Sequence, residues 1–290
     1  MESPDPNQER KLFKGEQVSI GTFCITKNEA AWIAPHVLRM LPYLDECVFF
    51  DGGSTDGTVE ILEAIIVEHP HGHKINIHRN RDCANLQDAY VELFNECLRT
   101  LTTDLAWFAH PDFYCVNPEQ LLKIRESKAT AMLTHMRSFA GEPGGDLYEI
   151  KGRGEQWKNI YRLRNPDFGA HYFGHYGAHE EDVYFSDITG EEHKNHAPFW
   201  DRYPYEIEDS GLEILHFSDV RHLSRRHDRM VKCLVNQGHP LDRAERIAKE
   251  HPRVTLKDAP GFAFIPSKYP GDFVNNQKKY SEHFKTPCSV

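Results

Sequence analysis

The sequence predicts an α/β fold in which a mostly parallel sheet is flanked by helices. Apolar runs of strand length alternate with helical segments through the first half of the chain, which is the pattern of βαβ crossover units. Several of these runs end in polar residues, as strands do where an open α/β sheet binds its ligand. The expected strands are 18–24, 46–50, 74–78, 105–109 and 129–136, and the expected helices are 29–40, 57–68, 85–99 and 118–126.

The region 18–62 contains two strand ends that carry polar residues. The apolar run 18–24 breaks into the triplet 27–29, Lys-Asn-Glu, before a helical stretch. A second apolar run stops on Asp51, and the turn 52–58 that follows reads Gly-Gly-Ser-Thr-Asp-Gly-Thr. Glycines allow backbone angles closed to other residues, and Ser, Thr and Asp are good helix N-caps. The two strand ends therefore form one candidate ligand site.

The carboxylate of Asp51 follows a buried strand, so rigid backbone holds it at the edge of the sheet. Such a group repels phosphate but accepts hydrogen bonds from a nucleobase N–H or a ribose hydroxyl. The alternative interpretation is that residues 51–57 form only a well-made strand-to-helix turn. No Gly-Lys-Ser or Gly-Lys-Thr follows and no G-x-G-x-x-G is present, which excludes a P-loop and disfavours a dinucleotide-binding fold.

The composition is that of an ordinary globular chain of 290 residues, with 39% hydrophobic and 27% charged residues. The formal net charge of -10 disfavours non-specific binding to nucleic acid or to membrane surfaces. No apolar stretch is long enough to span a bilayer, and the amino terminus is polar rather than signal-like. The seven cysteines are scattered without a C-x-x-C pair, which indicates free thiols and a cytoplasmic location.

A third strand end carries His110, Pro111 and Asp112 after the expected strand 105–109. In an extended segment, residues i and i+2 face the same side, so His110 and Asp112 can reach one ion. Imidazole is an acceptable ligand for Mn²⁺ and a poor one for Mg²⁺, which prefers oxygen. The alternative is that His110 only caps the strand and Asp112 begins a turn.

The second half of the sequence differs from the first in composition and in the pattern of expected strands. Residues 146–210 are rich in aromatic, His and Gly residues, and only short strands are expected there. A strand over 212–217 carries His216, and a basic helix is expected over 223–236. His216 is a further candidate metal ligand, or alternatively a half-buried strand histidine.

These motifs resemble those of the family-2 glycosyltransferases, nucleotide-sugar-dependent enzymes of the GT-A fold. In that family one strand ends near Lys-Asn-Glu and the next ends in D-[DG]-G-S-x-D-G-T, at the separation found here. Segment 156–185 is similar to the family's R-[IL]-[FY]-R … G-x-x-H-E stretch, and segment 216–221 to its H-[FLY]-x-x-V-R stretch. The sequence departs from the family's D-x-D motif, since His110 replaces the first aspartate. That departure leaves the metal, and the dependence on metal, open.

The resemblance implies an enzyme that transfers a sugar from a nucleotide-sugar, with a UDP-sugar favoured, to a hydroxyl acceptor with inversion. A divalent cation, with Mn²⁺ favoured over Mg²⁺, is expected to neutralise the leaving diphosphate. The expected acceptor is a glycan, a small molecule or modified DNA of the phage type.

The resemblance also implies which residues form the site. The expected nucleotide-sugar ligands are Thr26, Lys27, Asn28, Glu29, Asp51, Gly52, Gly53, Ser54, Asp82 and Arg221. The expected metal ligands are His110, Asp112 and His216. The expected catalytic carboxylates are Glu180, Glu181 and Asp182, of which Glu180 is the preferred general base.

The change in composition along the chain, taken with the resemblance, suggests four parts, of which the second and third are halves of one domain. These are a polar segment (1–17), a nucleotide-sugar-binding half (18–136), an acceptor-side half (137–236) and a helical or irregular extension (237–290).

Two other functional classes stay open at this point. A sugar nucleotidyltransferase would share the α/β sheet, but it usually carries a Gly-rich loop with Arg or Lys after its first strand. A module that binds a nucleotide-sugar or carbohydrate without turnover is compatible with the altered D-x-D motif.

Overall fold

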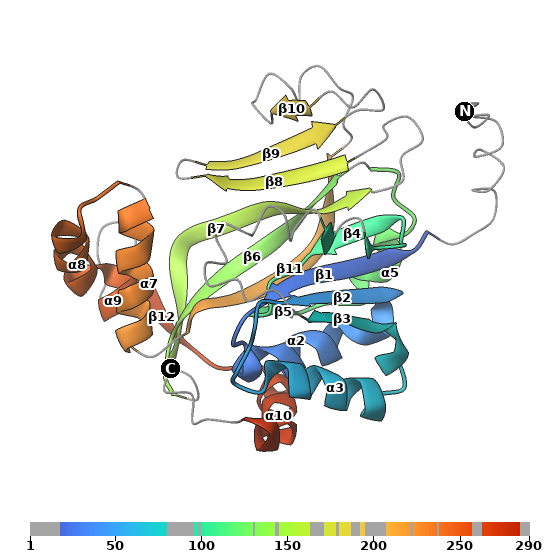
Figure 1. Cartoon of the computed structure of the whole chain (residues 1–290), viewed down its shortest axis with the longest axis horizontal. Helices are drawn as coiled ribbons and strands as arrows, with labels where there is room; N and C mark the ends of the chain where they lie inside the picture. Colours follow the sequence, from blue (N-terminus) through green and yellow to red (C-terminus); the bar gives the residue numbers. More distant parts are fainter. Residues whose placement is uncertain are drawn as a thin grey trace.

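The computed structural model shows a large sheet with helices packed against it (Figure 1). It describes residues 18–79, 96–97, 100–129, 131–142, 145–162, 171–177, 180–186, 192–194, 207–220, 223–236, 238–256 and 263–284. The sheet has nine strands in the order β3-β2-β1-β4-β7-β6-β11-β5, with β12 paired to β7. This is an α/β fold with a mostly parallel sheet, which confirms the predicted fold class.

The first half of the chain forms the parallel part of the sheet. Its elements are β1 (Ile20–Thr26), α2 (Ala30–Met40), β2 (Glu46–Asp51), α3 (Thr58–Glu68), β3 (Ile75–Arg79) and β4 (Leu105–Phe108). β2 pairs in parallel with β1 and β3, and β1 pairs in parallel with β4. Both faces of β1 and β2 are covered, which is why these strands read as continuous apolar runs. The predictions for these elements are confirmed, whereas the predicted helix 85–99 lies almost wholly outside the described residues.

The second half extends the sheet with longer strands of mixed direction. Its elements are β5 (Phe113–Cys115), α5 (Gln120–Ile124), β6 (Ala131–Gly141), β7 (Leu147–Arg162) and β11 (Ile207–Val220). β7 is antiparallel to β4 and β6, whereas β11 is parallel to β6 and antiparallel to β5. The prediction of only short strands over 146–210 was wrong, because β7 has 16 residues. Glycines and charged residues obscure its pattern, and pairing along both edges stabilises it instead.

A smaller sheet is formed by β8 (His171–Gly177), β9 (Glu180–Ser186) and β10 (Glu192–Lys194). Its order is β10-β9-β8, with both pairs antiparallel. Figure 1 draws this sheet above β7 and β6.

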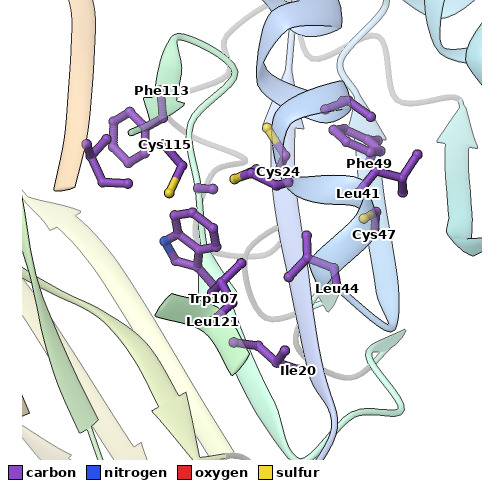
Figure 2. Packing of buried hydrophobic residues seen from close by; sticks show 14 of the residues in the cluster. Ile20, Cys24, Leu41, Leu44, Cys47, Phe49, Trp107, Phe113, Cys115 and Leu121 are labelled. Carbon is purple, nitrogen blue, oxygen red and sulfur yellow. The ribbon is translucent and has the colours of Figure 1, made fainter. Parts of the chain in front are cut away.

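The main hydrophobic core lies between the large sheet and helices α2 and α3. In Figure 2, Trp107 and Phe113 lie on one side of Cys24, and Phe49 and Cys47 lie on the other. Burying an aliphatic or aromatic side chain of this kind stabilises the fold by roughly 1.5–3 kcal/mol. The two cysteines are buried free thiols, and burial raises the pKa of both.

The chain after β11 forms helices that reach two parts of the molecule. α7 (Leu223–Asn236), α8 (Leu241–Glu250) and α9 (Pro252–Thr255) form a cluster of their own. The chain then returns as β12 (Ala263–Ser267) on the edge of β7 and as α10 (Gly271–Lys279) against α2. No helix in the described ranges is long and apolar enough to cross a membrane.

Gly57 lies where the end of the chain meets the turn before α3. Its φ is +102°, and a Cβ atom there would lie 2.1 Å from the carbonyl oxygen of His283. Gly238 has a similar φ of +87°, but a Cβ atom there would have nothing within 4 Å. A substitution at Gly238 therefore measures backbone strain alone, whereas one at Gly57 measures strain together with a steric clash against His283.

We expect Gly57→Ala to lower the free energy of unfolding by clearly more than Gly238→Ala does. Both variants carry a left-handed backbone cost of roughly 1–2 kcal/mol, but only Gly57→Ala also displaces the backbone of His283. Urea denaturation followed by circular dichroism measures both losses. Equal losses would show that the end of the chain does not rest on Gly57.

Candidate functional site

The carboxyl ends of three neighbouring parallel strands bring the predicted site residues to one edge of the sheet. The register pairs Thr26 of β1 with Asp51 of β2. On the other side of β1, the N–H of Ala109 donates to the carbonyl of Phe23 over 3.2 Å. The loops that follow β1, β2 and β4 therefore leave the sheet side by side.

The first two of these loops are joined by hydrogen bonds. Asn28 has a left-handed backbone with a φ of 57°, and its N–H donates to Ser54 Oγ over 2.9 Å. Its side-chain Oδ1 accepts from the N–H of Thr55 over 2.9 Å. The N–H of Glu29 donates to Thr58 Oγ1 over 2.8 Å. These bonds fix the two loops relative to each other before any ligand arrives.

Asp56 lies at the centre of this junction and is buried. Its Oδ1 accepts from the N–H and the hydroxyl of Thr58, at 3.0 and 2.6 Å. Its Oδ2 accepts from the N–H of Ala30 over 3.0 Å. One carboxylate thus accepts from the first N–H group of both α2 and α3, at helix ends where a negative charge is favoured.

Asp51 closes its own turn and faces β1. Its Oδ2 accepts from the N–H groups of Gly53 and Ser54, at 3.0 and 2.9 Å. The hydroxyl of Thr26 lies 3.4 Å from Oδ1. Both interpretations of this residue therefore have a structural basis, since Oδ2 shapes the turn while Oδ1 has acceptor capacity for a further donor.

Two of the three predicted metal ligands, Asp112 and His216, come together through the pairing of β5 with β11. His216 pairs with Phe113 in the register, and the N–H of Phe217 donates to the carbonyl of Asp112 over 3.0 Å. As a result, His216 Nε2 lies 3.6 Å from Asp112 Oδ1, and both side chains are largely buried. The ring of His110 lies 6.2 Å from the ring of His216.

The spacing of this pair can be compared with the requirements of a metal site. Two ligand atoms at roughly 2.1 Å from one ion lie about 3–3.5 Å apart, which is close to the distance between Asp112 and His216. In the ranges that the structure describes, no group of three His, Cys, Asp or Glu side chains is arranged to hold an ion. Among the described residues, Asp112 and His216 are therefore a pair of possible ligands and not a complete metal site.

Cys24 is a buried free thiol of β1. Burial raises its pKa most, and the negative charges of Glu29 and Asp112 raise it further. Glu29 belongs to the loop after β1 and Asp112 to the loop after β4.

His36 is a component of this region that the sequence analysis did not identify. It is 1% exposed on α2, and its Nδ1–H donates to the carbonyl of Phe113 over 2.9 Å. Burial lowers its pKa from 6.5 to about 4, although the bond to Phe113 and the charge of Asp112 oppose this shift. Its position among apolar residues on the buried face of a predicted helix is the signal that could have found it.

Arg39, one turn further along α2, holds the same strand. Its guanidinium donates to the carbonyls of Cys115 and Val116. α2 therefore fastens β5 at both ends, and with it the turn that carries Asp112.

The remaining predicted residues lie on β9 or outside the residues that the structure describes. Asp82 and Arg221 are outside the described residues. The three candidate carboxylates follow one another on β9, where Glu180, Glu181 and Asp182 pair with Gly177, Tyr176 and His175 of β8. Across the described strands, no backbone pairing joins this small sheet to the large one.

Comparisons with known proteins give distant similarities. The sequence matches no protein-family model and no curated protein. S. aureus TarS is 13% identical over 81% of this chain and 73% of its own, with a TM-score of 0.40. A complex of TarS with UDP is 17% identical over 42% of this chain and 36% of its own, with a TM-score of 0.34.

One further solved structure matches most of the chain. Glucosyl-3-phosphoglycerate synthase from Mycobacterium tuberculosis, in complex with Mn²⁺ and UDP-glucose, is 13% identical. The match covers 93% of this chain and 92% of that one, with a TM-score of 0.38.

The buried state of His36 predicts a loss of stability in acid. Its folded-state pKa of about 4 lies below its ordinary value of 6.5, so the unfolded chain binds the proton first as the pH falls. The contribution of neutral His36 to the free energy of unfolding is fully present above pH 6.5. It falls by roughly 3 kcal/mol between pH 6.5 and pH 4. We expect His36→Asn, which keeps a donor for Phe113 but does not titrate, to remove this part of the pH dependence.

Urea denaturation at several pH values measures the effect, with His73→Asn as the control. His73 is an exposed histidine, so its replacement tests whether any lost histidine produces the same change. A His36→Asn variant with the wild-type pH dependence would contradict the prediction.

Proposed function

We propose that the protein is a glycosyltransferase of the family-2 type, which transfers a sugar from a UDP-sugar to a hydroxyl acceptor with inversion. The observation that supports this most is the presence of two chemical groups on one sheet edge. These are the Asp51 turn after β2 and the Asp112–His216 pair beside β4. The Asp51 carboxylate can accept hydrogen bonds from the base or ribose of a nucleoside. The carboxylate and imidazole of Asp112 and His216 are suitable ligands for a cation that binds diphosphate. A nucleoside diphosphate has both parts.

In the proposed complex, Asp51 accepts hydrogen bonds from the base or the ribose. Thr26, loop 27–29 and residues 52–54 line the same edge, and Asp82 and Arg221 complete the donor site. Because hydrogen bonds already join the two loops, binding would cost little ordering of the backbone. The arrangement is thus suited to recognising a nucleoside without rearrangement.

The metal would be held by Asp112 and His216, with His110 beside them. A bound divalent cation, with Mn²⁺ favoured over Mg²⁺, supplies positive charge at the leaving diphosphate. Since Asp112 and His216 would supply two ligands, phosphate oxygens and water would complete the coordination. Metal and nucleotide are therefore expected to strengthen each other's binding.

Glu180 is the proposed general base, with Glu181 and Asp182 as alternatives on the same strand. Its carboxylate takes the proton of the acceptor hydroxyl while that oxygen attacks the anomeric carbon. The bond from this carbon to the diphosphate oxygen breaks, and the nucleoside diphosphate leaves with its electron pair. Attack from the side opposite the leaving group inverts the configuration.

A module that binds the same donor without turnover is the second candidate function. The observation that favours it is His110, which stands where the family carries the first aspartate of D-x-D. Release of UDP from a UDP-sugar in the presence of an acceptor library distinguishes the two functions, because only the enzyme produces it.

The donor-site proposal predicts a specific effect of Asp51→Asn. Asparagine keeps an oxygen that can accept from Gly53 and Ser54, but it replaces the other acceptor with an NH₂ donor. Loss of a hydrogen bond to a charged group, roughly 1.5–3 kcal/mol, should weaken UDP binding about 10- to 100-fold. Isothermal titration calorimetry measures this, with Asp242→Asn on the exposed face of α8 as a control for the charge change. Unchanged UDP affinity in Asp51→Asn would contradict the role of Asp51.

The metal proposal predicts a metal-dependent thermal shift. UDP should stabilise the protein more than GDP, CDP, ADP or dTDP do, and more with Mn²⁺ than with EDTA. At a hundred times its Kd, a ligand stabilises by about 2.7 kcal/mol. Asp112→Ala should lose the Mn²⁺-dependent part of the shift and keep the rest. A shift that is the same in EDTA would exclude the metal role, and no shift with any nucleotide would contradict the donor site.

A further inference from the structure

The C-terminal segment, residues 269–284, contacts four elements around the candidate site. It comprises Tyr269, Pro270, α10 and η3 (Ser281–His283). Although these residues are distant in sequence from the site, they pack behind α2, the turn before α3 and the strands β5 and β11.

Phe273 makes the central contact of this segment. It is 2% exposed, and its ring lies 5.1 Å from the ring of Phe217 on β11 and 5.7 Å from that of Trp32 on α2. Trp32 and Phe217 are themselves stacked, with ring centres 5.6 Å apart and an angle of 15° between the rings. The three rings form one buried cluster behind the site.

The alternation of β11 connects this cluster to the candidate metal ligand. Successive side chains of a strand point to opposite faces. Leu215 and Phe217 belong to the cluster around Phe273, whereas His216 lies between them and meets Phe113 on the other face. Phe217 and His216 are thus adjacent residues of one strand, with Phe217 packed in the cluster around Phe273 and His216 beside Asp112.

The polar contacts of α10 reach β5, the strand that pairs with β11. Asp272 pairs with Arg39 over 3.4 Å and accepts from the hydroxyl of Tyr114. Arg39 in turn donates to the carbonyls of β5 and the residue after it. Asp272 thereby helps to hold the strand that follows Asp112.

The far end of the segment reaches the donor loops. Gln277 donates to the carbonyl of Ala31 in the first turn of α2 over 2.9 Å. The carbonyl of His283 lies against Gly57, where no Cβ atom would fit. The segment thus contacts the first turn of α2 and the turn between β2 and α3.

We propose that the C-terminal segment is a positioning element of the candidate site, in which Phe273 sets the orientation of His216 towards Asp112 through Phe217 and Trp32. The inference deepens the proposed function and rests on it for its binding readout. Phe273 touches no ligand, and its effect passes through the strand that carries His216.

The test compares Phe273→Ala with Val274→Ala, a neighbour on the same helix that is 45% exposed. UDP affinity is measured by calorimetry with Mn²⁺ and with EDTA. Residues that support metal ligands typically change metal affinity about 10- to 100-fold. In Phe273→Ala, we expect the UDP affinity measured with Mn²⁺ to fall by about 10- to 100-fold. The UDP affinity measured with EDTA should stay at the wild-type value. Val274→Ala should match the wild type in both conditions.

A second readout does not depend on nucleotide. The imidazole ¹⁵N signals of His216, assigned by their absence in His216→Asn, should shift in Phe273→Ala and stay in place in Val274→Ala. If the wild type binds no UDP, the proposed function fails, and these signals alone decide the inference. If Phe273→Ala does not fold, Phe273→Leu, which keeps apolar volume without the ring, replaces it in both measurements.

Two results would overturn the inference. One is a folded Phe273 variant whose Mn²⁺-dependent gain and His216 signals equal those of Val274→Ala. The other is an equal loss of UDP affinity with Mn²⁺ and with EDTA while the His216 signals stay in place, since a general loss of stability affects both conditions alike.

Discussion

The carboxylate of Asp56 holds together the two loops on which the candidate site depends. Its two oxygens accept hydrogen bonds from the first residues of α2 and α3, so both helices begin at one buried charge. The N–H groups at the start of a helix lack partners within that helix, and a carboxylate between two such ends satisfies both. The loops after β1 and β2 must therefore lie side by side, and the bonds of Asn28 to Ser54 and Thr55 complete the junction.

α2 connects the loops after β1 and β2 to β5, the strand that follows Asp112. It begins at the Asp56 junction and fastens β5 through His36 and Arg39. A neutral, buried histidine suits this task, because it supplies one directed N–H without the cost of a buried charge. The same helix receives α10 on its outer side, so the two groups of candidate ligands share one rigid support.

Much of the first half could be predicted from the sequence because its signals are local. Thr26 to Glu29 and Asp51 to Thr58 interrupt long apolar runs, and such an interruption marks a strand end whatever the rest of the chain does. The three-residue strand β5 had no such signal, since it exists only by pairing with β11. The role of Phe273 was equally hidden, because its partners Trp32 and Phe217 are distant in sequence.

The sequence by itself determined the α/β class, the strands and helices of the first half, and the polar residues that end three neighbouring strands. These follow from hydrophobic periodicity and turn chemistry, which act over a few residues. Only the tertiary structure decided that His216 lies 3.6 Å from Asp112, that Asp56 accepts from the first N–H of two helices and that residues 269–284 pack behind the site. Each of these depends on contacts between distant segments, and such contacts form only when the whole sheet is assembled.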